Sequence, residues 1–472
     1  MVENNIRLIK PKYLPPLDKG FRPAVLANSA FRKAIAKNAV PLVLGLEREE
    51  GKVSRHKIEV TLENHPCKKA CQQYVERIVK FLLWQRGGHK LFVGGPSYIG
   101  DYLRKCYAKG GKGEFDSSFM GNLVYQKPFK VISCKLLEVP PESEIGISRG
   151  GSLEGFRIGF DLGATDRKVC AIKNGEVIYS EEVAWEPKIN EDPNYHYQEI
   201  LDALKTAASK LPRVDAIGGS SAGIYINNRP MVASLFRGVP EDRYEEVRNL
   251  FLRIQEELGI PIEVINDGDV TALAGAMSLK DSGVLGLAMG SSEAAGFVDR
   301  NGHILGWLNE LAFAPIDYSH DAPIDEWSKD RGCGSMYFSQ QCVFRLAPKV
   351  GISIPSNLHD AEKLKFVQEE LEGGNEAVAD IWKSIGIYLG YALAHYADFY
   401  DFDHILILGR CTSGKGGGLI IQSAKRVIED EFPEIARKIT IQRPDERSRL
   451  VGQAIAAASL PRMKGNNDDQ IQ

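Results

Sequence analysis

The chain has 472 residues, of which 43% are hydrophobic and 26% are charged, and its formal net charge is −3. Because this length exceeds that at which a single hydrophobic core stops growing, we expect two or three domains. The charge excludes a basic field for nucleic acids, and no apolar run reaches the ~18 residues of a membrane span. The eight cysteines lack disulfide spacing, and the first residues lack an apolar signal segment. We therefore expect a cytoplasmic protein whose direct partners include neither nucleic acid nor membrane.

Residues 1–150 are expected to form an α+β region of their own. Hydrophobic periodicity and turn residues predict, in order, a helix over 27–36, a hairpin over 41–62, a helix over 67–84, a strand over 90–93 and a helix over 98–107. A linker over 138–151, which contains Pro, Ser and Gly, separates this region from the rest. Its role is left open between covering a cleft, mediating oligomerisation and adding an α/β layer.

From residue 156 onward, strands and helices alternate, as is typical of mixed α/β layers. The polar residues at the C-terminus predict a disordered tail over 461–472. Between these points the sequence predicts strands within 158–179 and over 215–217, 262–265, 283–289 and 404–408, and helices over 197–210, 242–258, 270–279 and 377–400.

Residues 156–172 predict a strand, a tight turn and a second strand, with an acid and a hydroxyl at the turn. Gly163 has no Cβ, so the backbone can approach a phosphate closely. Thr165 can offer its hydroxyl and N–H groups to an oxyanion, and Asp161 can hold a hydrated Mg²⁺, which prefers oxygen ligands. The alternative is an ordinary hairpin whose Asp and Thr satisfy the turn, and this short pattern alone does not decide between the two.

Five segments that follow in order resemble the actin-like ATPase superfamily and, within it, the ROK (repressor, ORF, kinase) sugar kinases and repressors. The most specific is 259–274, which reads as a strand that ends in Asn266-Asp267 and enters an Ala-rich helix. The other four are 217–223, which is similar to the family's loop against the sugar; 289–298, the second phosphate loop; 306–311, the Gly-Glu motif; and the adenosine-side turn at 408–409 with the glycines of 414–418.

The resemblance implies an α/β actin-like ATPase (ribonuclease H-like) fold of two lobes, with an additional N-terminal α+β region over 1–150. The first lobe is expected over 156–274 and the second over 275–460, with a C-terminal helix that returns to the first. ATP and Mg²⁺ are the implied cofactors, and a small-molecule sugar is the implied substrate. A homodimer is left open. Residues 1–150 lack the three-helix pattern of a winged helix, so direct DNA binding is not expected.

The same resemblance assigns roles to individual residues. Asp267 is expected to be the general base, because a carboxylate within hydrogen-bond reach of a hydroxyl can accept its proton. The structural alternative is that Asp267 caps a helix that starts ahead of Val270. The resemblance also puts Asn266, Glu310, Ser221 and Gly223 against the sugar, Asp161 at Mg²⁺, and Gly163, Thr165, Gly290, Ser291, Gly409 and Arg410 at the nucleotide.

Several positions depart from the family's pattern. Glu293 lies in the second phosphate loop, where its carboxylate would repel a triphosphate unless it pointed away or bound a metal. Phe313 replaces the family's zinc-binding His, and Cys333 is the one thiolate kept from the Cys cluster, so we predict no zinc site. Arg410 stands in the adenosine-side turn, where it could stack on adenine, clamp a phosphate or be solvated.

Two functions follow from these residues. The first is ATP-dependent, Mg²⁺-requiring phosphorylation of a hydroxyl of a hexose or related carbohydrate, with Asp267 as general base. The second is a catalytically impaired sugar- or nucleotide-binding regulatory protein of the same fold. The intact Asn266-Asp267 pair favours the kinase, whereas Glu293 and the lost zinc ligands favour the regulator.

Overall fold

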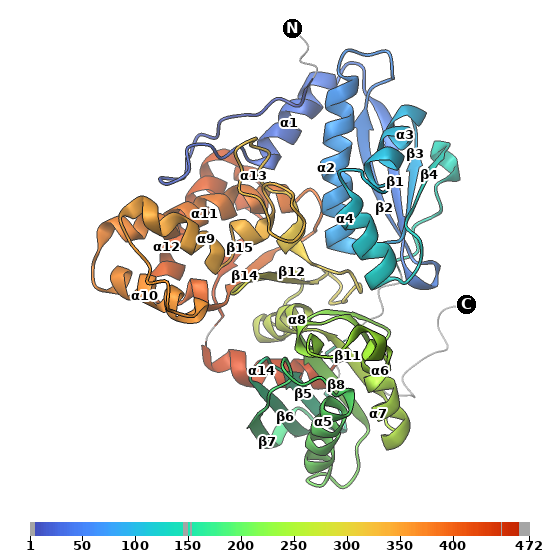
Figure 1. Ribbon diagram of the computed structural model, residues 1–472, viewed down its shortest axis with the longest axis vertical. Coiled ribbons are helices and arrows are strands. Elements are labelled where there is room, and N and C mark those ends of the chain that lie inside the picture. Colours follow the sequence, from blue (N-terminus) through green and yellow to red (C-terminus); the bar gives the residue numbers. More distant parts are fainter. Residues whose placement is uncertain (1–4, 145–149, 152, 445, 462–472) are drawn as a thin grey trace. The chain divides into compact units, whose positions relative to one another are not determined.

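The computed structural model describes residues 5–144, 150–151, 153–444 and 446–461 (Figure 1). The chain divides into two compact units. Unit 1 comprises Met1–Ile145, Leu287–Ala295 and Trp307–Arg443, and unit 2 comprises Gly146–Gly286, Gly296–Gly306 and Pro444–Gln472. Residues 1–145 thus share a unit with 307–443, whereas the sequence predicts that 1–150 form a region of their own. Of the predicted tail, 462–472 lie outside the described residues. No helix in the described part is long and apolar enough to cross a membrane.

A five-stranded mixed sheet forms the centre of unit 2. Its order is β11-β8-β5-β6-β7, in which β11, β8 and β5 are parallel and β6 and β7 continue the sheet in antiparallel fashion. The carboxyl ends of the three parallel strands therefore meet at one edge of the sheet. The strands are β5 (Phe156–Leu162), β6 (Asp166–Lys173), β7 (Glu176–Ala184), β8 (Ala216–Ser221) and β11 (Ile262–Asn266).

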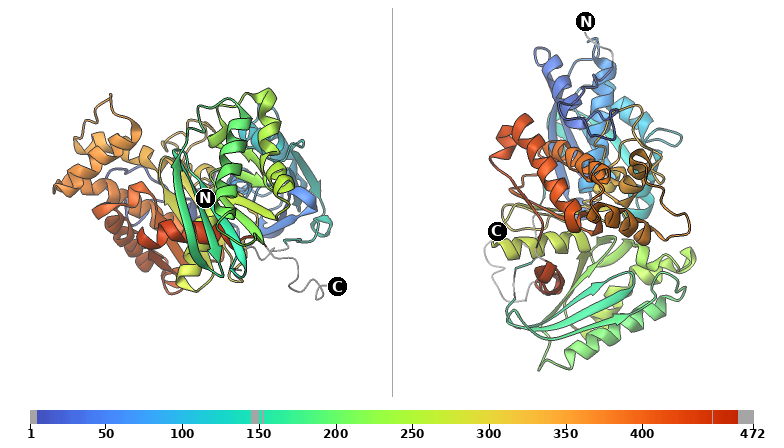
Figure 2. Two further views of the ribbon diagram at one scale, coloured as in Figure 1. Left: turned by 90° about the horizontal axis from the view of Figure 1, so that it is seen from below. Right: turned by 90° about the vertical axis from the view of Figure 1, so that its left-hand side faces the viewer.

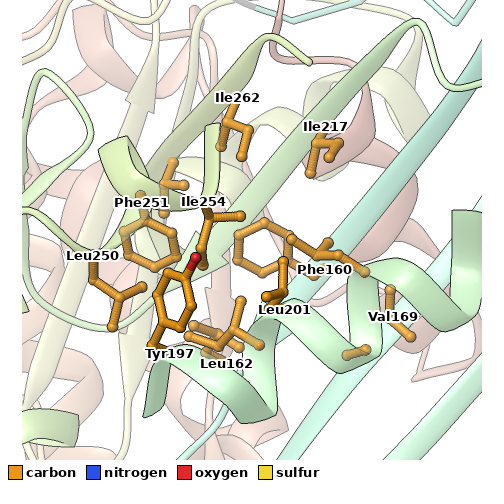
Figure 3. Packing of buried hydrophobic residues seen from close by; sticks show 14 of the residues in the cluster. Phe160, Leu162, Val169, Tyr197, Leu201, Ile217, Leu250, Phe251, Ile254 and Ile262 are labelled. Carbon is orange, nitrogen blue, oxygen red and sulfur yellow. The ribbon is translucent and has the colours of Figure 1, made fainter. Parts of the chain in front are cut away.

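One face of this sheet is covered by α5 (Pro193–Ala208) and α7 (Leu250–Leu258) (Figure 3). Successive residues of a strand point to opposite faces, so Ile158, Phe160 and Leu162 of β5 all enter the same buried cluster. The Phe160 ring stacks on Phe251 of α7, with 6.0 Å between ring centroids. Each such buried apolar side chain contributes about 1.5–3 kcal/mol relative to exposure.

The other face of the sheet is covered by α14 (Glu446–Ala458), which Figure 2 shows in dark red on the side opposite α5. This helix approaches the strands where they carry glycine. A Cβ at Gly159 would lie 2.0 Å from the Ala454 carbonyl oxygen, and one at Gly218 would lie 1.6 Å from that of Ala457. The first part of the predicted sugar loop 217–223 is therefore a buried strand, and Gly218 serves helix packing there.

The remaining elements of unit 2 lie, along the chain, between the strands and helices named above. Helix α8 (Asp267–Leu279) follows β11, and a hairpin of β9 (Ile224–Ile226) and β10 (Arg229–Val232) follows β8. The helix predicted over 242–258 is two helices, α6 (Tyr244–Arg248) and α7, separated at Asn249. The Asn249 side chain donates a hydrogen bond to the Glu245 carbonyl oxygen (3.0 Å). Such side-chain bonds compete with the backbone hydrogen bonds of a helix, which is why Asn is unfavourable inside helices.

The N-terminal part of unit 1 is an α/β layer, close to the elements that the sequence predicts. Its sheet has the order β2-β1-β3-β4, in which β1 is antiparallel to β2 and β3, and β4 is parallel to β3. The elements are α1 (Ala24–Ile35), β1 (Val40–Glu47), β2 (Val53–Val60), α2 (Lys68–Arg86), β3 (Lys90–Gly94), α3 (Ser97–Cys106), α4 (Glu114–Ser118) and the unpredicted β4 (Lys130–Cys134).

A second sheet has the order β13-β12-β14-β15. Two predictions are wrong here, because residues 293–298 are a strand rather than a loop, and the glycines of 414–418 begin helix α12 rather than forming a turn. Gly416 lets the Trp382 ring approach that helix, since its Cβ would lie 2.3 Å from Trp382 Nε1. The elements are β12 (Val284–Met289), β13 (Glu293–Val298), α9 (Gln340–Leu346), α10 (Asp360–Glu372), α11 (Glu376–Tyr396), β14 (His404–Leu408), α12 (Gly414–Glu431), α13 (Pro433–Ala436) and β15 (Thr440–Gln442).

The close approach of α14 to the sheet can be tested with two Gly→Ala substitutions. Gly218→Ala should lower the free energy of unfolding by about 1–3 kcal/mol, because the added methyl overlaps the α14 backbone. Gly452→Ala, within α14 itself, should be neutral or stabilising by up to about 1 kcal/mol, since its Cβ would meet Ala274 at an ordinary 3.6 Å. Urea denaturation measures both, and equal effects would contradict the packing described.

Candidate active site

The predicted site residues of unit 2 lie at the carboxyl ends of its parallel strands. Asp161 on β5 is in register with Ser220 on β8, and Ser221 is in register with Asn266 at the end of β11. Asp267 is the next residue and the first of α8. Ligands of open α/β sheets bind at such strand ends, so the fold brings these side chains together where a small molecule is expected.

Asn266 joins the start of α8 to the loop after β8. Its side-chain oxygen accepts from the Gly268 N–H (2.7 Å), and its amide donates to the Gly223 carbonyl oxygen (2.7 Å). Asn266 is therefore the helix N-cap, and the alternative that Asp267 is the cap is wrong. Gly223 has a φ of +128°, and a Cβ there would lie 2.5 Å from the Val232 carbonyl oxygen, so only glycine fits this loop.

The two carboxyl groups at the strand ends have different surroundings. Burial, and next the charge of Asp161, raise the pKa of Asp267 to about 6, against the opposing effect of the N–H groups at the start of α8. Burial also raises the pKa of Asp161, but Ser220 and Lys168 oppose that rise. Lys168 is the register partner of Asp161 on β6. Neighbouring acids with environments that differ in this way are typical of sites that use one as a base.

The turn between β5 and β6 is closed by its own backbone. The Gly163 N–H donates to the Asp166 carbonyl oxygen (2.9 Å), and a Cβ at Gly163 would lie 2.8 Å from that oxygen. The exposed Thr165 donates its hydroxyl to the Asp166 carboxylate (2.9 Å), as the ordinary-hairpin alternative requires. Asp161 takes no part in that turn. A hollow of about 640 Å³ adjoins Thr165 and is lined by residues that include Trp185, Lys188 and Tyr195.

Four residues near the site were not singled out from the sequence: Lys168, Ser220, Tyr225 and Asn228. The first two follow from strand register, which the sequence alone does not specify. Tyr225 lies near Asp267, whose charge contributes to raising the pKa of its phenol. Asn228 borders β11, where it donates to the Ile262 carbonyl oxygen (2.7 Å) and accepts from the Val264 N–H (2.8 Å). The Asn227-Asn228 pair, both with positive φ, is a hairpin signal that could have located this turn.

In unit 1 the predicted nucleotide residues lie at the ends of β12 and β14. Gly409 has a φ of +91°, and its Cβ would lie 2.4 Å from the Met289 carbonyl oxygen, so Gly290 and Gly409 are brought close together. The Gly290 carbonyl oxygen accepts from the Gln340 N–H (2.9 Å). Ser291 and Arg410 are exposed and can reach a ligand in solvent. A separate apolar hollow of about 440 Å³ is lined by Leu371, Gly374, Asn375, Glu376, Ala379, Lys415, Gly418 and Leu419.

Glu293 points into the interior of unit 1. Its side chain is 2% exposed, accepts from the Tyr396 hydroxyl (3.4 Å) and lies so close to Gly334 that a Cβ there would be 2.1 Å from Glu293 Oε2. Burial and the charge of Glu310 raise the pKa of Glu293 to about 8, so the group is mostly protonated at neutral pH. Glu293 is thus a neutral acid in the interior. Of the three orientations considered from the sequence, its side chain has the one that points away from the loop's expected phosphate.

Aromatic packing surrounds Phe313, the residue that the sequence resemblance aligns with the family's zinc-binding His. The Phe313 ring lies 4.3 Å from Trp84 and 5.7 Å from Phe115, measured between centroids. Cys333 is fully buried, and burial raises the pKa of its thiol to about 12. Among the described residues, no group of three or more His, Cys, Asp or Glu side chains is arranged to hold a metal. The absence of zinc stays a prediction, which metal analysis of the purified chain can test.

No protein-family model and no curated protein sequence matches this chain. Solved structures do match it. The ROK hexokinase of Thermus thermophilus is 16% identical over 64% of this chain and 97% of its own, with a TM-score of 0.50. A ROK glucokinase of Streptomyces griseus, solved with glucose and AMPPNP, is 19% identical over 64% and 99%, with a TM-score of 0.48. A ROK transcriptional regulator, a homologue of the E. coli Mlc protein, is 19% identical over 65% and 79%, also with 0.48.

The match to the Thermus hexokinase establishes the fold. The chain has the α/β fold of the ROK proteins, which the five sequence motifs predicted, and the match to this hexokinase covers 64% of the chain. At this level of identity the roles of individual residues stay predictions, including those of Asp267, Glu310 and Arg410.

The raised pKa of Asp267 predicts that this side chain destabilises the folded protein. Asp267→Asn should raise the free energy of unfolding by about 2 kcal/mol near pH 7.5, because ionising a carboxyl whose pKa is raised to about 6 penalises the folded state. The penalty is absent below about pH 4, where the group is protonated in both folded and unfolded chains, and is complete above about pH 6. Urea denaturation at several pH values measures it, with Asp202→Asn on the exposed side of α5 as the control. A stability gain that does not change with pH would contradict this account.

Proposed function

From the fold of the ROK sugar kinases, which this chain has, we propose that the protein transfers the γ-phosphoryl group of ATP to a hydroxyl of a hexose or related carbohydrate. The observation that carries the proposal is that Asp161, Asn266 and Asp267 lie at one edge of the sheet, at the carboxyl ends of β5 and β11, the two parallel strands that flank β8. Phosphoryl transfer needs an alcohol held beside a phosphate, a group to accept its proton, and a metal ion to neutralise charge. These residues supply the chemical groups for each requirement.

Asp267 is the proposed general base. An alcohol loses its proton as it attacks phosphorus, and a base with a pKa slightly below neutral is ionised at physiological pH yet still basic enough to accept that proton. The pKa of about 6 meets this condition, and burial by the protein is its main cause. The position at the first residue of α8 fixes the carboxylate on a rigid element.

Asp161 is the proposed metal-side carboxylate. Its oxygens are of the type that Mg²⁺ prefers, and a hydrated ion held by one protein carboxylate and by phosphates is usual for this metal. When bound, Mg²⁺ would neutralise charge on the ATP phosphates. Lys168, opposite Asp161 on β6, adds a positive charge that the turn itself lacks. We propose that Gly163 and Thr165 approach the phosphates from this turn.

We propose Ser221, Gly223 and Asn266, at the strand ends of unit 2, as sugar contacts. For Glu310 the same role is proposed from the sequence resemblance alone. Asn266 gives one amide hydrogen to Gly223, which leaves a second for a sugar hydroxyl. A site that hydrogen-bonds several hydroxyls rejects analogues that lack them, because its buried polar groups would be unpaired. Ser221 is fully buried at the strand end, so it can contribute such a group.

Gly290, Ser291, Gly409 and Arg410 are the proposed nucleotide contacts. The glycines permit close backbone approach to a ligand, and Arg410 presents an exposed guanidinium. The apolar hollow lined by α10, α11 and α12 is a candidate for the adenine ring, since ligand pockets are mainly apolar.

The eight cysteines are free, which supports a reducing, cytoplasmic location.

Release of ADP with a panel of sugars tests the proposed reaction. Asp267→Asn should lower kcat by about 100- to 10,000-fold, the usual contribution of general-base catalysis, while sugar binding is kept. Asp202→Asn, a matched change on the surface, should leave kcat unaltered. Absence of turnover with every sugar, together with measurable sugar or Mg-ATP binding, would favour the regulatory alternative instead.

The pH dependence of turnover gives an independent check on the base. Because Asp267 must be ionised to accept a proton, kcat/KM should fall about tenfold per pH unit below about pH 6 and be level above it. Initial rates at saturating Mg-ATP across this range provide the measurement. A level profile down to about pH 5 would rule out Asp267 as the titrating base.

A further inference from the structure

The segment that carries Glu310 begins with two hydrogen bonds to the end of helix α2. The Asn309 N–H donates to the Gln85 carbonyl oxygen (2.9 Å), and the Glu310 N–H donates to that of Trp84 (2.9 Å). The last four carbonyl groups of a helix have no partner inside it, and α2 ends at Arg86. The proposed sugar-binding residue therefore completes the hydrogen bonding of a helix from the N-terminal region.

The same segment is held a second time, a few residues later. The Ala24 N–H donates to the Ile316 carbonyl oxygen and the Tyr318 N–H to that of Arg22, each at 2.9 Å. The Arg22 N–H also donates to the Asp317 carboxylate (2.9 Å). Residues 309–318 are thus fixed at both ends by residues that precede position 90.

Between these two points, side chains of the N-terminal region fill the space under the segment. The Phe313 ring packs on Trp84, whose indole N–H donates to Asp116 (2.9 Å). The buried Lys80 ammonium lies 3.1 Å from Asp116 and 3.0 Å from Asp330. A buried ion pair holds its partners firmly, because separating them would leave an uncompensated charge. Helix α2 is therefore bound to the segment by main-chain and aromatic contacts, and Lys80 joins the same helix to Asp330 beyond the segment.

Asn309 has an unusual conformation that these contacts maintain. Its φ is +52°, a left-handed conformation that Asn adopts more readily than most other non-glycine residues, and its side chain is 3% exposed. The Tyr400 hydroxyl donates to its side-chain oxygen (2.9 Å), and the Gln85 amide donates to the Phe399 carbonyl oxygen (2.9 Å). The backbone just before Glu310 is thus held from α2 and from the residues that follow α11.

We propose that the N-terminal region, through α2 and residues 22–24, is the element that positions Glu310 for the sugar. The inference rests on the proposed function, in which Glu310 binds the acceptor. It gives the N-terminal region, whose role the sequence leaves open, a part in holding Glu310. In the resemblance that the sequence motifs carry, a zinc cluster would lie at Phe313 and Cys333, and here contacts of α2 occupy that place. Trp84 and Gly87 are positioning residues in this arrangement.

Two glycines with nearly the same backbone angle provide a matched test. Gly87, directly after α2, has a φ of +82°, and its Cβ would lie 2.9 Å from Leu308 Cγ and 2.1 Å from the Tyr125 hydroxyl. Gly87→Ala should therefore push the residue that precedes Asn309. Gly110, in the same region, has a φ of +77° and nothing within 4 Å of its Cβ. Gly110→Ala places a methyl group at a similar φ but with no neighbour that it could displace.

The full-length protein carrying each change would be compared in two measurements. Gly87→Ala should raise the KM for the sugar about tenfold while the KM for Mg-ATP changes less than about twofold, because one ligand's contacts move and the other's do not. Amide hydrogen exchange at 309 and 310, measured without ligand, should become about tenfold faster. Trp84→Phe, which loses the bond to Asp116, should act in the same direction. Gly110→Ala and Trp327→Phe, the latter at a 75% exposed side chain, should change neither quantity.

The outcomes separate this inference from the proposed function. If Gly87→Ala lowers thermal stability as Gly110→Ala does, yet leaves exchange at 309–310 and the KM for the sugar unaltered, the inference is wrong. If exchange becomes faster while the KM for the sugar is unaltered, Glu310 does not bind the acceptor and the inference fails as well. If the unsubstituted protein turns over no sugar, the proposed function fails. The exchange data then report whether α2 holds the segment.

Discussion

Two carboxyl groups, Asp161 and Asp267, are held near one another at the ends of parallel strands, and the site depends on this arrangement. Parallel pairing of β5, β8 and β11 makes it unavoidable, since strands that run in one direction end at one edge. Burial, and next the like charge of Asp161, disfavour the ionised form of Asp267 and raise its pKa. Ionised Asp267 therefore destabilises the folded protein, at a position where the proposed reaction needs a base of moderate pKa.

The surrounding packing keeps that edge in position. Gly159 and Gly218 admit α14 against one face of the sheet, while Phe160 and its neighbours bind α5 and α7 to the other. Asn266 then couples the end of β11 to the loop after β8 through a pair of hydrogen bonds. Because these contacts are close and well packed, the strand ends have little freedom to separate.

In unit 1, aromatic packing holds the segment that carries Glu310, and a buried ion pair lies beside that packing. Phe313 packs against Trp84, whose indole N–H donates to Asp116, and Asp116 forms a buried ion pair with Lys80. Buried carboxyl groups are treated in two ways within the unit. Asp330 is paired with Arg77 (2.7 Å) and its pKa is lowered. Glu293 instead accepts a hydrogen bond from Tyr396, and burial raises its pKa so that it is neutral. Both solutions avoid an unpaired buried charge.

The sequence by itself determined the order and kind of most elements, the ROK-like fold and the chemical identity of the candidate groups. These follow from local periodicity, turn residues and short motifs, which neighbouring residues encode. Only the tertiary structure decided that Asn266 is the helix cap, that Lys168 and Ser220 flank Asp161, that Glu293 points into the interior, and that residues 1–145 hold the Glu310 segment. Each of these depends on strand register or on contacts between residues far apart in the chain, which no local pattern specifies.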